Sequence, residues 1–145
     1  MSEETNREET LQRQIKHLEF IQTTITRMGQ NSFQMKNWTV VSLSALVALY
    51  VGSCEISYLL LSLYAVGIFW LLDGYYLCQE RMFRNLYKAV VDDISNNKFD
   101  IVPFSMDTHE RFCICEWLSA CFSITISFMY IPILFVLALF IKFNI

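Results

Sequence analysis

Residues 38–77 read WTVVSLSALVALYVGSCEISYLLLSLYAVGIFWLLDGYYL, and this stretch decides the fold. Glu55 and Asp73 are its only acidic or basic residues. A soluble domain typically carries about 25% charged residues, whereas about 20 apolar residues in a helix cross a hydrocarbon core of ~30 Å. The stretch therefore predicts two membrane-spanning helices, over residues 35–54 and 56–77, with Trp38 as an anchor at the membrane interface.

A very short link joins these two predicted spans, because the turn between them falls within residues 53–57. Such a link makes the two helices neighbours that run antiparallel, as a transmembrane hairpin. A further apolar run predicts a third span over residues 117–141. Pro132 lies inside it and predicts a kink near Phe128, because proline lacks the backbone donor and clashes with the preceding turn.

The charged flanks of the hairpin also have helical periodicity, with apolar residues at spacings of three and four. We expect a helix from about residue 8, within a cytoplasmic segment 1–34, that runs into the first span. A second helix continues past the second span, within a segment 78–116, to a stop near Asn96-Asn97. A linker over 98–106 and a capping box formed by Asp107 and Glu110 then precede the third span. The predicted fold class is all-α: an integral membrane protein whose first two of three transmembrane helices form a hairpin extended into the cytoplasm.

The lysines and arginines predict the orientation, because cytoplasmic flanks carry an excess of them. Ten of the eleven lie before the first span or between the second and third, and only Lys142 follows the third. We therefore expect a cytoplasmic N-terminus and a periplasmic C-terminus in a bacterial inner membrane. About 37 residues with glutamates at their start precede the first apolar run, which favours a retained membrane segment over an export signal.

Opposite charges face each other when the hairpin is reflected about its turn near residue 54. The reflection places Asp73 opposite Lys36 and brings Glu80 near Arg27 or Met28. A carboxylate at membrane depth is costly and usually has a partner. We therefore predict structural ion pairs from Lys36, Asp73, Arg27 and Glu80. The alternative for Asp73 is a functional ion or proton site.

Small residues recur at every fourth position on two of the predicted spans. They are Ser44, Ala48 and Gly52 on the first, and Ser119, Ser123 and Ser127 on the third. Small residues let membrane helices approach closely, and their hydroxyls bond to the same or a neighbouring helix. We favour helix packing for both stripes, with a pore lined by serines as the sharper alternative.

Signatures of catalysis are absent from the chain, which has no GxSxG, HExxH, phosphate-binding glycine loop or paired CxxC motif. We predict no catalytic residues, no cofactor and no metal site. The one metal reading, Cys113-x-Cys115 with His109, is weaker than the ordinary role of cysteine as a small apolar residue in buried helices. The net charge of −3 argues against nucleic acid as a partner.

Three segments carry a recognisable pattern: RMxxNSFxxKxW from Arg27, FWxLDxYYLxxERxFRxLY from Phe69 and PFSMDT from Pro103. Together they resemble a family of small, largely uncharacterised bacterial multi-span membrane proteins, associated with mobile and phage-defence neighbourhoods. The resemblance covers about residues 11–108 and leaves out the third span. It implies a characteristic polar layer at the cytoplasmic border, made by Asn31, Lys36, Asp73, Glu80 and Arg81.

These observations lead to one main functional hypothesis and one alternative. The main hypothesis is a non-enzymatic inner-membrane protein that self-associates and perturbs or permeabilises the bilayer, as an anti-phage effector does. Its partners would be the lipid bilayer, further copies of itself and a cytosolic protein or small-molecule trigger. The alternative is a membrane anchor or regulatory subunit that recruits a cytosolic partner through its basic cytoplasmic helices.

Overall fold

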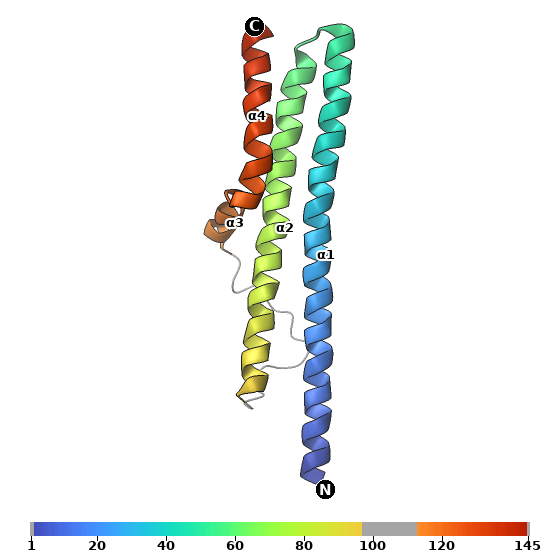
Figure 1. The fold of residues 1–145 in the computed structure, drawn as a ribbon, viewed down its shortest axis with the longest axis vertical. Coiled ribbons are helices and arrows are strands. Elements are labelled where there is room, and N and C mark those ends of the chain that lie inside the picture. The colour runs from blue at the N-terminus through green and yellow to red at the C-terminus, as the bar shows by residue number, and fades with distance from the viewer. Residues whose placement is uncertain (1, 97–112, 145) are drawn as a thin grey trace.

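The computed structural model describes residues 2–96 and 113–144, and all regular elements among them are helices. The all-α prediction is confirmed. Figure 1 shows α1 and α2 as a long antiparallel pair, with α4 beside the upper part of α2 and the short α3 to one side. The helices are α1 (Ser2–Ser53), α2 (Ser57–Ser95), α3 (Ile114–Cys121) and α4 (Ile124–Asn144).

The hairpin of α1 and α2 is longer than its apolar part. α1 begins at Ser2, before the expected start near residue 8, and runs unbroken from the charged flank into the apolar run. The turn after it is closed by Cys54, which has a left-handed backbone (φ 58°) and donates its N–H to the Tyr50 carbonyl at 2.7 Å. α2 ends at Ser95, and the Asn96 side-chain amide caps it by donating to the Asp92 carbonyl at 2.7 Å.

The third apolar stretch forms two helices rather than one. α3 ends at Cys121 and α4 begins at Ile124, so the predicted single helix over 117–141 is wrong. α4 continues through Phe128 and Pro132, and the interruption comes earlier than the proline predicts. A tertiary contact lies at this interruption, where the Cys121 carbonyl accepts a hydrogen bond from Trp70 Nε1 at 2.9 Å. The predicted linker and capping box lie outside the described residues.

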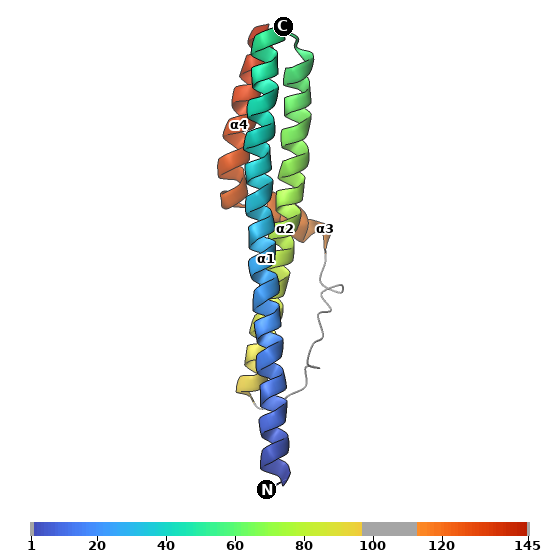
Figure 2. The same ribbon diagram turned by 90° about the vertical axis from the view of Figure 1, so that its right-hand side faces the viewer.

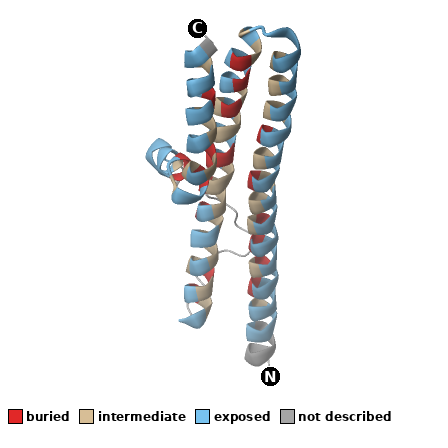
Figure 3. Cartoon of the chain, turned by 45° about the horizontal axis from the view of Figure 1, so that its top comes forward, coloured by how far each residue is buried: buried red, intermediate tan, exposed pale blue. Residues whose placement is uncertain are grey.

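Buried residues follow the sides on which the helices face one another (Figure 3). One core cluster joins α2 and α4 and consists of Val66, Ile126, Tyr130 and Leu137. In Figures 1 and 2 the hairpin turn and the C-terminus lie at one end of the molecule, and the N-terminus lies at the other.

Two of the described helices are long and apolar enough to cross a membrane, judged by length and composition: Ser57–Ser95 and Ile124–Phe143. α1 does not meet the same criterion. The first predicted span therefore stays a prediction. The second lies within α2, and most of the third lies within α4.

Candidate functional site

A buried carboxylate lies where α1 and α2 pack together. Asp73 of α2 is completely buried, and the Lys36 ammonium of α1 lies 2.8 Å from its Oδ1 and 2.6 Å from its Oδ2. The Lys36 side chain is 22% exposed, so the pair touches solvent only through its cationic member. The structure thus brings together the two residues that the reflected hairpin placed opposite each other.

A serine on α1 completes the surroundings of this carboxylate. Ser32 Oγ donates to Asp73 Oδ1, and the Lys36 ammonium donates to Ser32 Oγ at 2.9 Å. Ser32 and Lys36 are four residues apart, so both side chains leave α1 on the same face. Sequence reasoning did not select Ser32, although this spacing from Lys36 was the available signal.

α4 joins the site one helical turn nearer the hairpin turn. The Tyr130 hydroxyl of α4 is completely buried, lies 3.3 Å from Thr39 Oγ1 of α1, and donates to the Phe69 carbonyl of α2 at 3.4 Å. Thr39 in turn donates to the Met35 carbonyl at 2.8 Å. Polar side chains from three helices therefore meet in one region. We call it the polar junction: Ser32, Lys36, Thr39, Asp73 and Tyr130.

Close packing at a glycine fixes α3 against α2 beside the polar junction. A Cβ added at Gly74 would overlap Cys121 Sγ and lie 3.2 Å from Cys121 Cα, so only glycine fits without movement. Trp70, one turn away, donates to the Cys121 carbonyl and stacks on the Tyr130 ring at a centroid distance of 6.3 Å. Trp117 Nε1 adds a hydrogen bond to the Leu71 carbonyl at 3.3 Å.

The second predicted ion pair takes a different form. Glu80 pairs with Arg84 on its own helix, with 2.6 Å between Oε1 and Nη2. Its carboxylate faces Gly29 of α1, where an added Cβ would lie 3.6 Å from Oε2. Arg27 is exposed, and no ion pair joins it to Glu80 within the described ranges. The reflection placed Glu80 slightly out of register and ignored the partner four residues along α2.

The small-residue stripe of α1 faces away from the other helices. Ser44, Ala48 and Gly52 are all exposed, and a Cβ added at Gly52 would meet nothing within 4 Å. Ser44 Oγ donates to the Val40 carbonyl at 2.8 Å, so its hydroxyl is satisfied within its own helix. The stripe packs against no other helix among residues 2–96 and 113–144.

The serine stripe expected on the third span does not form one helical face. Ser119 lies in α3, Ser123 lies in the interruption, and Ser127 lies in the first turn of α4. The spacing of four residues assumed a continuous helix, whereas α3 ends at Cys121 and α4 begins at Ile124. Ser119 is exposed, and the other two are half-buried.

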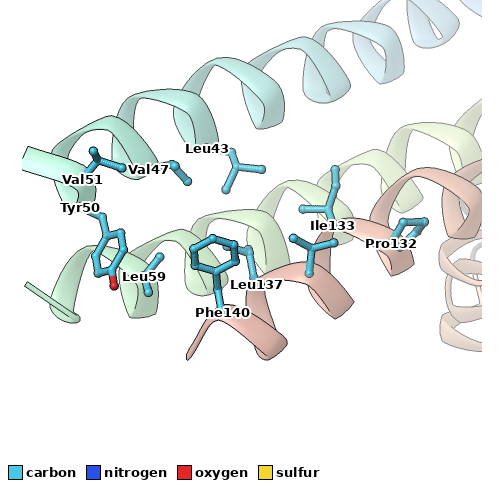
Figure 4. A pocket seen from close by; sticks show the side chains of 10 residues that line it. Leu43, Val47, Tyr50, Val51, Leu59, Pro132, Ile133, Leu137 and Phe140 are labelled. Carbon is cyan, nitrogen blue, oxygen red and sulfur yellow. The ribbon is translucent and has the colours of Figure 1, made fainter. Parts of the chain in front are cut away.

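An apolar groove opens beyond the polar junction, between α1, α2 and α4 (Figure 4). Its volume is about 400 Å³. Ring and branched side chains line it, and the hydroxyl of Tyr50 is the only polar side-chain group among them. The lining residues are Leu43, Val47, Tyr50, Val51, Leu59, Pro132, Ile133, Val136, Leu137 and Phe140.

The contacts of the polar junction are those of a structural link between helices. Within residues 2–96 and 113–144, no three His, Cys, Asp or Glu side chains lie close enough to hold a metal ion. Cys113 and Cys115, the candidate thiols, are exposed at the start of α3. Hydrogen bonds from Cys115 lower the pKa of Cys113, and the hydrogen bond with Cys113 raises the pKa of Cys115. The main feature of the site is the ion pair between Lys36 and Asp73, which joins α1 to α2.

No family model, curated protein or solved structure matches this chain. The geometry of the polar junction, the small-residue stripe and the apolar groove therefore carries the functional argument.

Proposed function

We propose that this protein is a non-enzymatic effector of anti-phage defence that self-associates in the bacterial inner membrane and permeabilises it. In this proposal residues 35–54, 56–77 and 117–141 cross the bilayer, with the N-terminus in the cytoplasm and the C-terminus in the periplasm. A cytosolic protein or a small molecule acts as the trigger on the cytoplasmic parts of α1 and α2.

The outward stripe of α1 is the observation that carries the proposal. Ser44, Ala48 and Gly52 form an exposed face of small residues in the apolar part of the helix. Without large side chains in the way, the backbone of a second copy can approach closely, and van der Waals packing then stabilises the pair in lipid. The large exposed apolar residues of α2 and α4 suit contact with acyl chains, among them Leu60, Leu61, Phe128 and Phe135.

Permeation by this protein needs more than one copy. Beyond the polar junction, the space between α1, α2 and α4 is the apolar groove, which offers an ion almost nothing to replace its water. An ion path therefore has to form between protomers, and self-association becomes the step that produces the effect. This links the α1 stripe to the proposed activity.

The decisive test combines assembly with membrane potential. The protein is expressed from an inducible promoter with a potential-sensitive dye, and its subunit count in detergent is measured by mass. Ala48→Leu together with Gly52→Leu should reduce the count and abolish depolarisation. Ala138→Leu, a matched change at an exposed position of α4, should alter neither. Depolarisation by a strictly monomeric variant would refute the proposal.

The alternative of a membrane anchor makes a different prediction in the same experiment. Induced cells would keep their potential under every condition, and the purified protein would carry a cytosolic partner in fixed ratio. Substitutions on the α1 stripe would leave that partner bound, because it would attach to the cytoplasmic helices.

The proposed orientation is tested with single-cysteine variants. Cys54 lies exposed in the hairpin turn, and a membrane-impermeant maleimide should label it in intact cells. Cys115 is also exposed, at the start of α3, and should react only after the membrane is opened. Cys78 cannot report the side, because it is buried in the packed helices. Labelling of Cys115 in intact cells would overturn the orientation.

A further inference from the structure

A second cavity lies between α2 and α3, on the side of the polar junction away from the hairpin turn. Its volume is about 320 Å³, within the range of about 300–1,000 Å³ typical of small-molecule sites. Buried Cys78 and Met82 lie among its lining residues, with exposed polar side chains beside them. We call it the border pocket, and its lining residues are Cys78, Arg81, Met82, Asn85, Cys115, Glu116 and Ser119.

Opposite charges line the border pocket from two different helices. Arg81 comes from α2 and Glu116 from α3. Among the described residues these two side chains form no ion pair, either with each other or elsewhere, whereas the neighbouring Glu80 and Arg84 pair with each other at 2.6 Å. The pocket thus holds a cation and an anion that remain available to complementary groups of a ligand.

The depth of the border pocket limits what that ligand is. In the proposed topology the second span ends at Leu77, one residue before Cys78, so the pocket lies at the cytoplasmic headgroup level. Trp117, next to Glu116, is amphipathic and belongs at the same level. A phosphate oxygen accepts strong hydrogen bonds from a guanidinium, and an ammonium donates them to a carboxylate.

We propose that the border pocket binds a phosphoethanolamine group, with Arg81 and Asn85 on the phosphate and Glu116 and Ser119 on the ammonium. The source is a phosphatidylethanolamine headgroup of the cytoplasmic leaflet or a free phosphoethanolamine. This inference rests on the topology of the proposed function but needs neither the oligomer nor depolarisation. Binding of the headgroup adds a charged link between α3 and α2 to the hydrogen bonds that the Trp70 and Trp117 side chains already make.

Lipid retention by the purified full chain tests this proposal. The protein in detergent is titrated with phosphatidylethanolamine or phosphatidylglycerol, and bound lipid is counted by native mass spectrometry. Phosphatidylglycerol has the phosphate but no ammonium, so it should bind about tenfold more weakly. Arg81→Gln should weaken the binding of both lipids about tenfold. Glu116→Gln should remove the preference for phosphatidylethanolamine, because only the ammonium contact is lost.

Matched charge changes elsewhere provide the controls. Lys88→Gln removes an exposed cation from α2, and Glu55→Gln removes an exposed anion from the hairpin turn; neither should alter lipid binding. Competition by free phosphoethanolamine would show that the headgroup suffices, and its failure to compete would identify the intact lipid as the ligand. Equal affinity for the two lipids in the unmodified protein, or an effect of the controls as large as that of Arg81→Gln, would overturn the proposal.

The outcome is separable from that of the proposed function. The variant with Ala48→Leu and Gly52→Leu should retain the lipid preference even as a monomer, because the border pocket lies within one protomer. Loss of lipid preference in that variant would show that the pocket is completed by a second copy and would also contradict the inference.

Discussion

At the polar junction α1, α2 and α4 are joined by hydrogen bonds and an ion pair, whereas nearer the hairpin turn the same helices part around the apolar groove. This difference indicates which contacts fix the relative positions of the helices. Polar contacts need defined distances and angles, so the junction fixes the register of the helices. Dispersion contacts between large apolar side chains tolerate small shifts, so the groove allows the ends of the helices to move.

Breaking the ion pair should be the largest perturbation of the junction. Lys36→Met strands a fully buried carboxylate, and the loss of one partner of a buried pair typically costs about 3–5 kcal/mol. Asp73→Asn should cost less, because the ammonium that remains is partly exposed and still bonds Ser32. Thermal unfolding in detergent measures both effects, with Lys88→Met as the control at an exposed position.

The double change gives the sharper result. Lys36→Met combined with Asp73→Asn should recover part of the loss caused by Lys36→Met alone, which a double-mutant cycle quantifies. A coupling energy of zero between the two substitutions would show that the ion pair does not stabilise the polar junction. If Asp73→Asn instead leaves stability intact and abolishes depolarisation with no rescue at Lys36, Asp73 is a functional ion or proton site.

A side chain at Gly74 should cause the next largest loss of stability. Gly74→Ala forces α3 away from α2, and overpacking of this kind costs about 1–3 kcal/mol. Gly67→Ala is the matched control on the same helix, because its Cβ would meet nothing within 4 Å. The control should be neutral or stabilising, since alanine favours a helix. Equal shifts in melting temperature for the two variants would contradict the close contact with Cys121.

Removing the indole hydrogen bond tests why the third apolar stretch is interrupted. Trp70→Phe leaves the Cys121 carbonyl without its donor and should cost about 0.5–1.5 kcal/mol. Cys121 should then react faster with a thiol reagent, because α3 is held less firmly. Trp38→Phe, at an exposed tryptophan of α1, should change neither quantity. An unchanged rate at Cys121 would place the cause of the interruption elsewhere.

A substitution in the apolar groove should change stability least. Val47→Phe adds volume to an open space and should change stability by less than about 0.5 kcal/mol, as typical substitutions at uncrowded sites do. Thermal unfolding again provides the measurement. A loss comparable with that of Gly74→Ala would mean that the groove is closed in the membrane and would erase the contrast between the two regions.

Sequence reasoning was most successful for the hairpin. A short turn leaves two helices only one way to run, so residues equidistant from it must face each other, and the sequence alone was enough to pair Lys36 with Asp73. The same reflection misplaced Glu80, because it ignored Arg84 on the same helix. Ser32 was missed although its spacing of four residues from Lys36 was an available signal, and Tyr130 was missed because nothing local in the sequence places its hydroxyl beside α1 and α2.

The α3–α4 region could not be predicted in the same way. No proline or glycine marks the interruption between Cys121 and Ile124, and the kink that Pro132 predicts near Phe128 stays a prediction. The contact at the interruption comes from Trp70, about fifty residues away along the chain, whose indole N–H donates to the Cys121 carbonyl. Contacts between segments so distant in sequence leave no local pattern. Because the interruption was not predicted, the three serines were wrongly expected to lie on one helical face.

The unbroken length of α1 carries one helix from the charged N-terminal segment to the hairpin turn. At 1.5 Å per residue, the part from Lys36 to Ser2 is about 50 Å long and the part from Lys36 to Ser53 about 25 Å. His17 and Ile21 are fully buried along the longer part, so α1 is held at more positions than the ion pair alone. A displacement imposed near the N-terminus therefore has to shift these packed residues before it reaches the apolar end of the helix.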